Sequence, residues 1–369
     1  MPCKVDAASV NWVTGDEALA ATVATWGNVI GLDTEFIRTD TFFPLPGLYQ
    51  IIAGGQIYLL DPLTINDWSG FVELLENPQV VIVMHACGED LELMRHHMGA
   101  IPTNIFDTQV AHAFLSTNFS TSYANLVSEL LDEDLAKHET RSDWRARPLT
   151  DDQIRYASED VIYLPELYRV LREGLRDSGR EQWFVELMHD RGRYQPGDPD
   201  EHYRNNKRAW RLAGDDLAVL QRLTAWRERL AMTEDVPRKR IVWDEHLLDF
   251  ARVQELTEQT VRETVPKTIA QRYAEQLLAE HRHGREGDPL PKLEQPLSAR
   301  QAEVGKQLRD VARTCAEGLA LSPELLARKR DIEECLRHFS ATGELSDAYS
   351  GWRGRLVGDE FQAILKAQT

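Results

Sequence analysis

The sequence predicts an α/β domain, with helices packed on a sheet, followed by two all-helical modules. Three features predict this organisation. Runs typical of strands come first along the chain and helical patterns follow, which favours a sheet covered by helices. Beyond residue 205 the apolar residues recur only at helical spacing. Two polar stretches that contain prolines, residues 190–202 and 285–298, indicate boundaries between three segments.

The first segment, residues 1–200, contains the strand-like runs. Strands are expected at residues 29–36, 48–53, 57–61 and 80–84, which are rich in β-branched and other apolar residues. Gly54-Gly55-Gln56 joins the second and third runs as a hairpin turn. Helical periodicity then appears at residues 90–98, 108–115, 123–131 and 150–171.

The remaining chain forms two helical modules of about 80 residues each, at 206–285 and 295–369. Apolar residues recur at helical spacing in both modules: Leu217, Leu220, Leu223, Trp226 and Leu230 in the first, Leu308, Val311 and Cys315 in the second. We interpret these stripes as the cores of the modules.

Charge and cysteine content limit the function classes. The formal net charge is −18, and a count along the sequence gives about −18 for residues 1–200 and close to zero for each later segment. A basic surface for nucleic acid is therefore not evident, although carboxylates suit a metal site. The four cysteines form no CxxC pair, and neither a signal peptide nor a membrane-spanning run is recognisable. We expect a cytoplasmic protein that does not bind membranes.

Asp33 and Glu35 are two residues apart on the first expected strand. Because strand side chains alternate between faces, both carboxylates point the same way. Two acids that share one side of an apolar strand repel each other, and a divalent cation would compensate them. A strand end with exposed acids would give the same pattern.

A second acidic motif follows the expected strand at residues 80–84. Glu89 and Asp90 stand after a turn that contains glycine, at the start of a helical pattern. Acids are also favourable at a helix N-terminus for purely structural reasons. Spacing alone does not choose between Glu89 and Asp90.

The third motif pairs Tyr156 with Asp160 within the helical run at 150–171. Residues at i and i+4 share one helix face. A phenol one turn from a carboxylate can hold a water beside a metal bound by that carboxylate, although a surface hydrogen bond is the simpler reading. Together the three motifs fit hydrolysis assisted by two metal ions. Mg²⁺ and Mn²⁺ are expected, because these ions prefer oxygen ligands.

In this order and spacing the motifs resemble the DEDD exonuclease superfamily, in its tyrosine subgroup. Residues 141–150, RSDWRARPLT, and the TDTFFP segment at 39–44 narrow the likeness to the ribonuclease D family. The resemblance spans residues 28–175. It implies a ribonuclease H-like fold, in which a mixed sheet is flanked by helices.

The resemblance also implies the roles of individual residues. Asp33, Glu35 and Asp160 would bind the first metal, while Asp33 would bridge to the second and Asp90 would support it through water. Tyr156 would orient the attacking water. The side chains expected beside the terminal nucleotide are Thr34, Phe36 and His85.

Basic residues precede the third motif at Lys137, Arg141, Arg145 and Arg147. They could contact phosphates, and Arg147 is taken as a substrate-binding residue. Pairing of this loop with the acids at 132–134 explains the same residues equally well.

The helical modules carry a likeness of their own. Residues 206–285 resemble the HRDC module, a small helical bundle associated with nucleic-acid binding. Residues 295–369 resemble a degenerate second copy. Since neither is strongly basic, the alternative is that they shape a funnel or stabilise the catalytic domain.

The expected activity is that of a 3′-to-5′ exoribonuclease that releases nucleoside 5′-monophosphates. The resemblance implies RNA with a single-stranded 3′ end as substrate, transfer RNA precursors in particular, and a monomer. Two alternatives are a DNA exonuclease of the same superfamily and a catalytically silent RNA-binding scaffold. The scaffold would be expected to have lost one of the acids.

Overall fold

The computed structural model describes residues 10–135, 142–189 and 191–367. Its strands are β1 (Asn11–Val13), β2 (Val29–Ile37), β3 (Leu45–Ala53), β4 (Gln56–Leu60), β5 (Val81–Met84) and β6 (Ile105–Asp107). The helices of the first 190 residues are α1 (Asp16–Val23), α2 (Ser69–Leu75), α3 (Gly88–Met98), α4 (Thr108–Ala113), α5 (Tyr123–Leu131), α6 (Asp151–Ile162), α7 (Leu164–Asp177) and α8 (Glu181–Met188).

The later helices are α9 (Gly214–Glu234), α10 (Arg238–Ile241), α11 (Asp244–Arg252), α12 (Glu258–Thr264), α13 (Lys267–Glu286), α14 (Ala299–Leu319), α15 (Pro323–Leu326), α16 (Lys329–Thr342) and α17 (Trp352–Lys366). Short 3₁₀ helices lie at His202–Asn205, Ala209–Arg211 and Asp347–Tyr349. No helix in the described part of the chain combines the length and apolarity that a membrane crossing requires.

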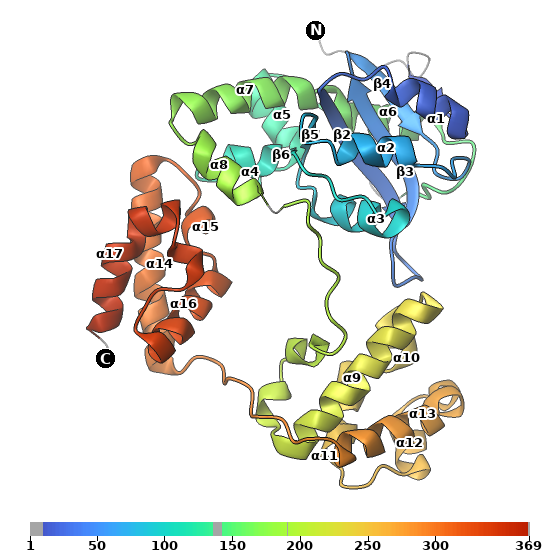
Figure 1. The fold of residues 1–369 in the computed structure, drawn as a ribbon, viewed down its shortest axis with the longest axis vertical. Coiled ribbons are helices and arrows are strands. Elements are labelled where there is room, and N and C mark those ends of the chain that lie inside the picture. The colour runs from blue at the N-terminus through green and yellow to red at the C-terminus, as the bar shows by residue number, and fades with distance from the viewer. Residues whose placement is uncertain (1–9, 136–141, 190, 368–369) are drawn as a thin grey trace. The chain divides into compact units, whose positions relative to one another are not determined.

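The strands form one mixed sheet in the order β1-β4-β3-β2-β5-β6 (Figure 1). β2, β5 and β6 run parallel, with Val29 opposite Val81, whereas β3 and β4 form the antiparallel hairpin predicted around Gly54-Gly55. β2 lies inside the sheet, and its Ile30 and Leu32 are fully buried. The strand that carries Asp33 and Glu35 is therefore held by neighbours on both sides.

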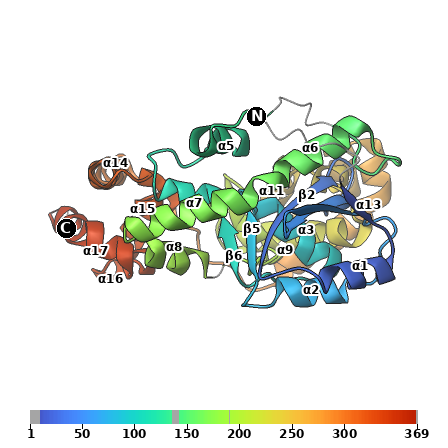
Figure 2. The same ribbon diagram turned by 90° about the horizontal axis from the view of Figure 1, so that it is seen from above.

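Helices cover both faces of this sheet. α6 and α7 lie along one face, and α1 and α2 lie on the opposite face (Figure 2). Gly31 allows the close approach of α7, because a Cβ there would lie 2.5 Å from Ile52 and 2.9 Å from Leu164. The helix pair α6–α7 is thereby packed tightly beside the acidic end of β2.

The run predicted as one helix at residues 150–171 is two helices. Thr150 begins α6 with a capping box that involves Gln153. α6 ends at Ile162, and α7 starts with Pro165 in its first turn, where the missing N–H of proline is tolerated. Periodicity continued across the break because both helices bury the same kind of apolar face.

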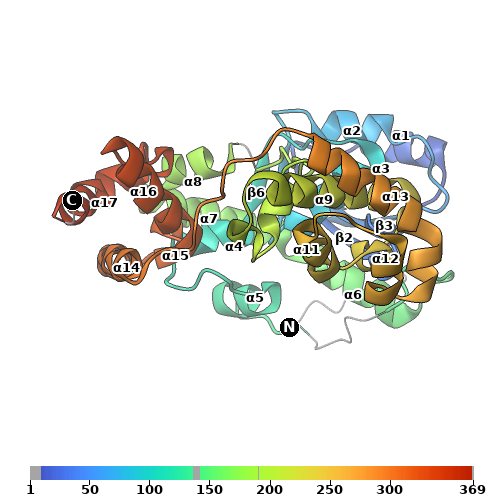
Figure 3. The same cartoon turned by 90° about the horizontal axis from the view of Figure 1, so that it is seen from below.

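The chain divides into two compact units, although three segments were predicted. Met1–Ile37, Pro46–Tyr194 and Leu297–Thr369 form the first, while Arg38–Leu45 and Gln195–Pro296 form the second. The helices α14–α17, which cluster together in Figure 3, thus belong with the sheet.

Aromatic stacking and hydrogen bonds attach α14–α17 to the first domain. Trp352 is fully buried and stacks on Trp183, with ring centroids 5.2 Å apart and an angle of 9°. The Ser322 amide donates to the Ala113 carbonyl at 2.9 Å, and Arg180 donates to carbonyls of both parts. This segment is an integral part of the compact unit that contains the sheet.

The second unit is a helical bundle in which α9 packs against α11 and α13. Buried Glu228 accepts hydrogen bonds from Arg227, its equally buried neighbour, and from Arg238. Phe42 of the β2–β3 loop is buried in this unit's core, and its amide donates to Asp235 at 3.0 Å. Such ion pairs neutralise much of the positive charge of α9 and α10.

Candidate active site

The end of β2 supplies the first two acids. Asp33 and Glu35 are both partly buried, and α6 brings Asp160 to them. One carboxylate oxygen from each of the three residues lies within 4.8 Å of the others. Oxygen ligands this close together fit Mg²⁺ or Mn²⁺. They do not favour Zn²⁺, which prefers nitrogen and sulfur ligands.

Asp90 is buried in the first turn of α3, whereas its neighbour Glu89 is exposed. The hydroxyl of Thr34, which lies between the two acids of β2, donates a hydrogen bond to the Asp90 carboxylate. The structure therefore directs Asp90 toward the acidic end of β2 and Glu89 away from it. Sequence spacing had left this choice open.

Tyr156 lies one helical turn before Asp160 on α6, and its hydroxyl is hydrogen-bonded to the Asp160 carboxylate. The Tyr156 ring is half-buried and packs at 5.9 Å from Trp144. Because the ring is held on one side, the hydroxyl stays at the edge of the carboxylate group.

The acids are electrostatically unsatisfied as a group. Burial and then the charges of Asp160 and Asp90 raise the pKa of Glu35 to about 8. Burial also raises the pKa of Asp160 to about 7 and that of Asp90 to about 6, although hydrogen bonds from Tyr156 and Thr34 oppose the shifts. For Asp33, burial followed by the three neighbouring acids moves the pKa well above its usual range. A bound cation would remove this repulsion.

His85 stands on the turn between β5 and α3, and both of its ring nitrogens have protein partners. Nδ1 lies 2.9 Å from the Thr108 hydroxyl, and Nε2 lies 3.1 Å from the Thr121 carbonyl. Burial lowers the pKa of the imidazole. The ring is thus fixed and favours the neutral form. Phe36, at the end of β2, is partly buried.

Tyr123 was not singled out from the sequence, yet it lies beside the acids. Its ring meets His85 edge-on at 5.6 Å, and its hydroxyl accepts a hydrogen bond from the Tyr163 amide at 3.3 Å. Burial raises the pKa of the Tyr123 hydroxyl, and the charges of Asp160 and Asp33 contribute. No local motif marks this residue, because its position depends on the packing of α5 against α7.

The basic residues before α6 have structural partners where the structure describes them. Arg147 forms a bidentate ion pair with Asp61 at 2.9 and 2.7 Å and also donates to the Gly47 carbonyl. Arg145 donates to the Pro46 carbonyl at 2.8 Å. The predicted phosphate contact of Arg147 stays a prediction, and it would compete with these bonds. Lys137 and Arg141 lie outside the described residues.

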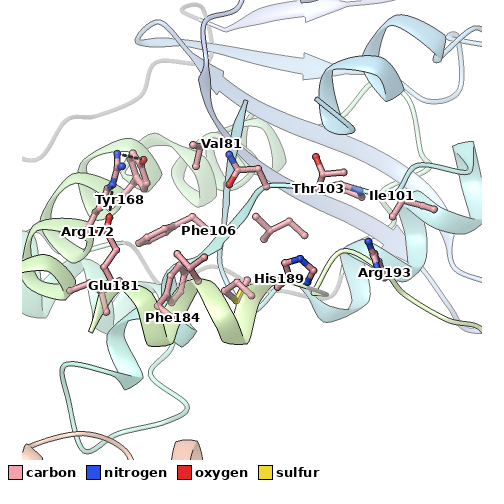
Figure 4. Close-up of a pocket in the computed structure, with 16 residues that line it drawn as sticks. Val81, Ile101, Thr103, Phe106, Tyr168, Arg172, Glu181, Phe184, His189 and Arg193 are labelled. Atoms are coloured by element: carbon pink, nitrogen blue, oxygen red, sulfur yellow. Dashed lines mark hydrogen bonds and ion pairs between the residues drawn. The ribbon is translucent and has the colours of Figure 1, made fainter. Parts of the chain in front are cut away.

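A cavity of about 450 Å³ lies elsewhere in the first unit, between the β5–β6 edge and α7–α8 (Figure 4). Its walls are largely apolar, and Arg172 at one end bonds to Tyr168 and Glu181. Among the described residues that line it, none is a predicted site residue. The cavity and the acidic cluster are therefore separate features.

Comparison with known families agrees with this geometry. A 3′-5′ exonuclease family model matches residues 10–176, and an HRDC domain model matches residues 216–280. With the mixed sheet and the convergent acids on β2 and α6, these matches define a 3′-to-5′ exonuclease of the DEDD type.

Full-length relatives narrow the class. Ribonuclease D of Pseudomonas paraeruginosa is 39% identical over 98% of each chain. Ribonuclease D of Escherichia coli is 32% identical, with 96% of this chain and 98% of that protein covered. The crystal structure of Escherichia coli RNase D, described as an exoribonuclease involved in structured RNA processing, matches with a TM-score of 0.89 at 31% identity, covering 97% and 99% of the two chains.

The chain belongs to the ribonuclease D family. It is a 3′-to-5′ exoribonuclease, a hydrolase of phosphodiester bonds. The predicted fold class and family are confirmed, and the HRDC match covers most of the first predicted helical module.

Proposed function

We propose that the acidic cluster holds two divalent ions, Mg²⁺ or Mn²⁺, during RNA hydrolysis. Asp33, Glu35 and Asp160 hold the first ion. Asp33 and Asp90 would help to hold the second ion. The observation that carries this assignment is the approach of three carboxylates within 4.8 Å of one another. When bound, such ions neutralise phosphate charge and lower the pKa of water.

The remaining site residues would orient the attacking water and bind the 3′-terminal nucleotide. Tyr156, which is hydrogen-bonded to Asp160, would orient the attacking water. Thr34, Phe36 and His85 contact the 3′-terminal nucleotide. Since both nitrogens of His85 already have partners, its contact with the nucleotide is made through the ring carbons.

RNA with a single-stranded 3′ end is the proposed substrate, with transfer RNA precursors as its natural source. A substrate strand must enter an acidic domain, so the divalent ions supply the positive charge that the protein surface lacks. We further propose a monomer in the cytoplasm. The three described cysteines, Cys87, Cys315 and Cys335, are free thiols, which favours a reducing compartment.

The test uses a 5′-labelled RNA with a short single-stranded 3′ tail, incubated with Mg²⁺ or with a chelator. A ladder that shortens from the 3′ end only with Mg²⁺ is expected. Asp160→Asn should abolish shortening, because it removes a ligand charge with little change of shape. Asp151→Asn, an exposed acid on the same helix, is the matched control and should keep full activity. Near-normal turnover by Asp160→Asn would refute the metal assignment.

A second pair of variants tests the acid on α3. Asp90→Asn should reduce turnover strongly, whereas exposed Glu89→Gln should not. Equal activity of the two variants would remove Asp90 from the site. A DNA of the same sequence serves as the substrate control, and equal cleavage of DNA and RNA would favour a less selective nuclease.

A further inference from the structure

The carboxylate of Asp107 is fully buried at the end of β6 and joins two separate elements. It caps α4 by accepting from the Gln109 and Val110 amides, at 3.0 and 3.3 Å. The same oxygen, Oδ1, accepts from the Ala86 amide at 3.0 Å. Oδ2 lies 3.4 Å from the Cys87 amide. One side chain therefore holds the turn that leads from β5 into α3.

Within that turn the Gly88 amide donates to the Ala86 carbonyl at 2.7 Å, and the amides of Ala86 and Cys87 are bound by Asp107 from outside. Ala86 has a positive φ of 54°, which is unfavourable for a residue with a Cβ. Cys87, the N-cap residue of α3, makes no side-chain capping hydrogen bond. The first turn of α3 is thus positioned from outside, by Asp107 on the neighbouring strand.

The residue that depends on this turn is Asp90. It lies three residues after Cys87 in the first turn of α3, and Thr34 binds its carboxylate from β2. Thr108 holds the start of the same turn, since its hydroxyl donates to the Met84 carbonyl at 3.1 Å. A shift of the turn would move the Asp90 carboxylate relative to the acids of β2.

We infer that Asp107 is a positioning residue for the metal site, which sets the place of Asp90 by holding the Ala86–Cys87 turn. This inference rests on the proposed role of Asp90. Asp107 acts on Asp90 through the backbone of the turn. Its negative charge also contributes to the raised pKa of Asp90, and Asp107→Asn removes that charge while it keeps the main acceptor. Its removal should weaken divalent metal binding before it affects RNA binding.

Two substitutions separate this role from the capping of α4. Asp107→Ser keeps a good N-cap for α4, but its shorter side chain cannot reach the Ala86 amide as well. Asp107→Asn keeps one carbonyl oxygen for the three amides that Oδ1 now serves. It loses the longer contacts of Oδ2, which include those with the Cys87 amide at 3.4 Å and with Arg191 at 3.5 Å. Ser298→Ala removes the cap of α14 in the same compact unit and controls for general loss of stability.

The measurements are Mn²⁺ binding by calorimetry without RNA, and the Mg²⁺ concentration that gives half-maximal turnover. Asp107→Ser should weaken Mn²⁺ binding and raise the half-saturating Mg²⁺ by about 10- to 100-fold, as loss of support around a metal ligand does. Asp107→Asn should stay within about threefold of wild type, because the main acceptor remains. The KM for RNA at saturating Mg²⁺ should not change.

The inference is overturned if Asp107→Ser binds Mn²⁺ as wild type does, or if Ser298→Ala loses as much affinity. Asp90→Asn is measured in parallel to separate the two proposals. If Asp90→Asn itself leaves Mn²⁺ binding and turnover intact, the assignment of Asp90 has failed and the positioning role fails with it. If Asp90→Asn is impaired while Asp107→Ser is not, only the positioning role is wrong.

Discussion

Asp160→Asn should stabilise the metal-free protein at pH 8 even though it abolishes turnover. Burial, opposed by the Tyr156 hydrogen bond, raises the pKa of Asp160 from 3.8 to about 7. Because the pKa is higher in the folded than in the unfolded protein, the protonated Asp160 carboxyl contributes to the free energy of unfolding. This contribution is fully present below about pH 3.8 and is lost as the pH rises through about 7. The amide of Asn is neutral at every pH, so the variant does not bear the cost of burying an ionised group.

The size of the effect follows from the two pKa values. Because one pKa unit corresponds to about 1.36 kcal/mol, the ionised Asp160 carboxylate costs on the order of 4 kcal/mol above pH 7. At about 2–4 °C per kcal/mol, Asn would raise Tm by at most about 8–16 °C. Neighbouring acids share protons with Asp160, so the measured rise should be several degrees.

Thermal unfolding in a chelator, from pH 5 to pH 8, measures this effect. The gain of Asp160→Asn over wild type should be largest at pH 8 and should shrink toward pH 5. Mg²⁺ should then stabilise wild type far more than the variant. Asp151→Asn, which changes an exposed acid of the same helix, should show neither effect. An Asp160→Asn protein no more stable than wild type at pH 8 without metal would refute the reasoning.

Three further predictions concern the pH dependence of the Mg²⁺ requirement, the orientation of the attacking water by Tyr156, and the attachment of α14–α17 to the first unit. If Glu35 and Asp160 bind the metal as proposed, protons compete with it there, because burial raises their pKa values to about 8 and about 7. The half-saturating Mg²⁺ should therefore fall as the pH rises from 6 to 8. Steady-state kinetics at several pH values would measure this, and a constant requirement would contradict it. Tyr156→Phe should lower kcat by roughly 10- to 100-fold, because the water is less well oriented, while calorimetry shows unchanged Mn²⁺ binding. An unchanged kcat would remove the water-orienting role. Trp352→Ala should destabilise the first unit by about 3–5 kcal/mol through loss of its stacking on Trp183. Urea unfolding should shift for the sheet as well as for α14–α17, and a shift confined to these helices would show that they unfold separately.

The acids of the candidate site could be recognised in the sequence because their spacing is local. Asp33 and Glu35 are two residues apart on a strand, so their side chains lie on one face. Tyr156 and Asp160 are four residues apart on a helix, so they also share a face. The strands found at β2, β3, β4 and β5 were recognisable for a related reason, since each is long or apolar enough to carry its own pattern. By contrast, β1 and β6 have three residues each, too few to show a period, and the helices α1, α2 and α8 were not anticipated.

The sequence by itself determined the fold class, the family and the acids that could carry the chemistry, because periodicity and motif spacing are properties of neighbouring residues. Tertiary structure alone decided that Asp90 rather than Glu89 meets Thr34, and that Asp107 and Tyr123 lie beside the site. It also decided that α14–α17 join the first unit through Trp183 and Trp352. The physical reason is common to these cases. Each contact forms between elements far apart in the chain, so it depends on which buried surfaces meet, and no local pattern records that choice.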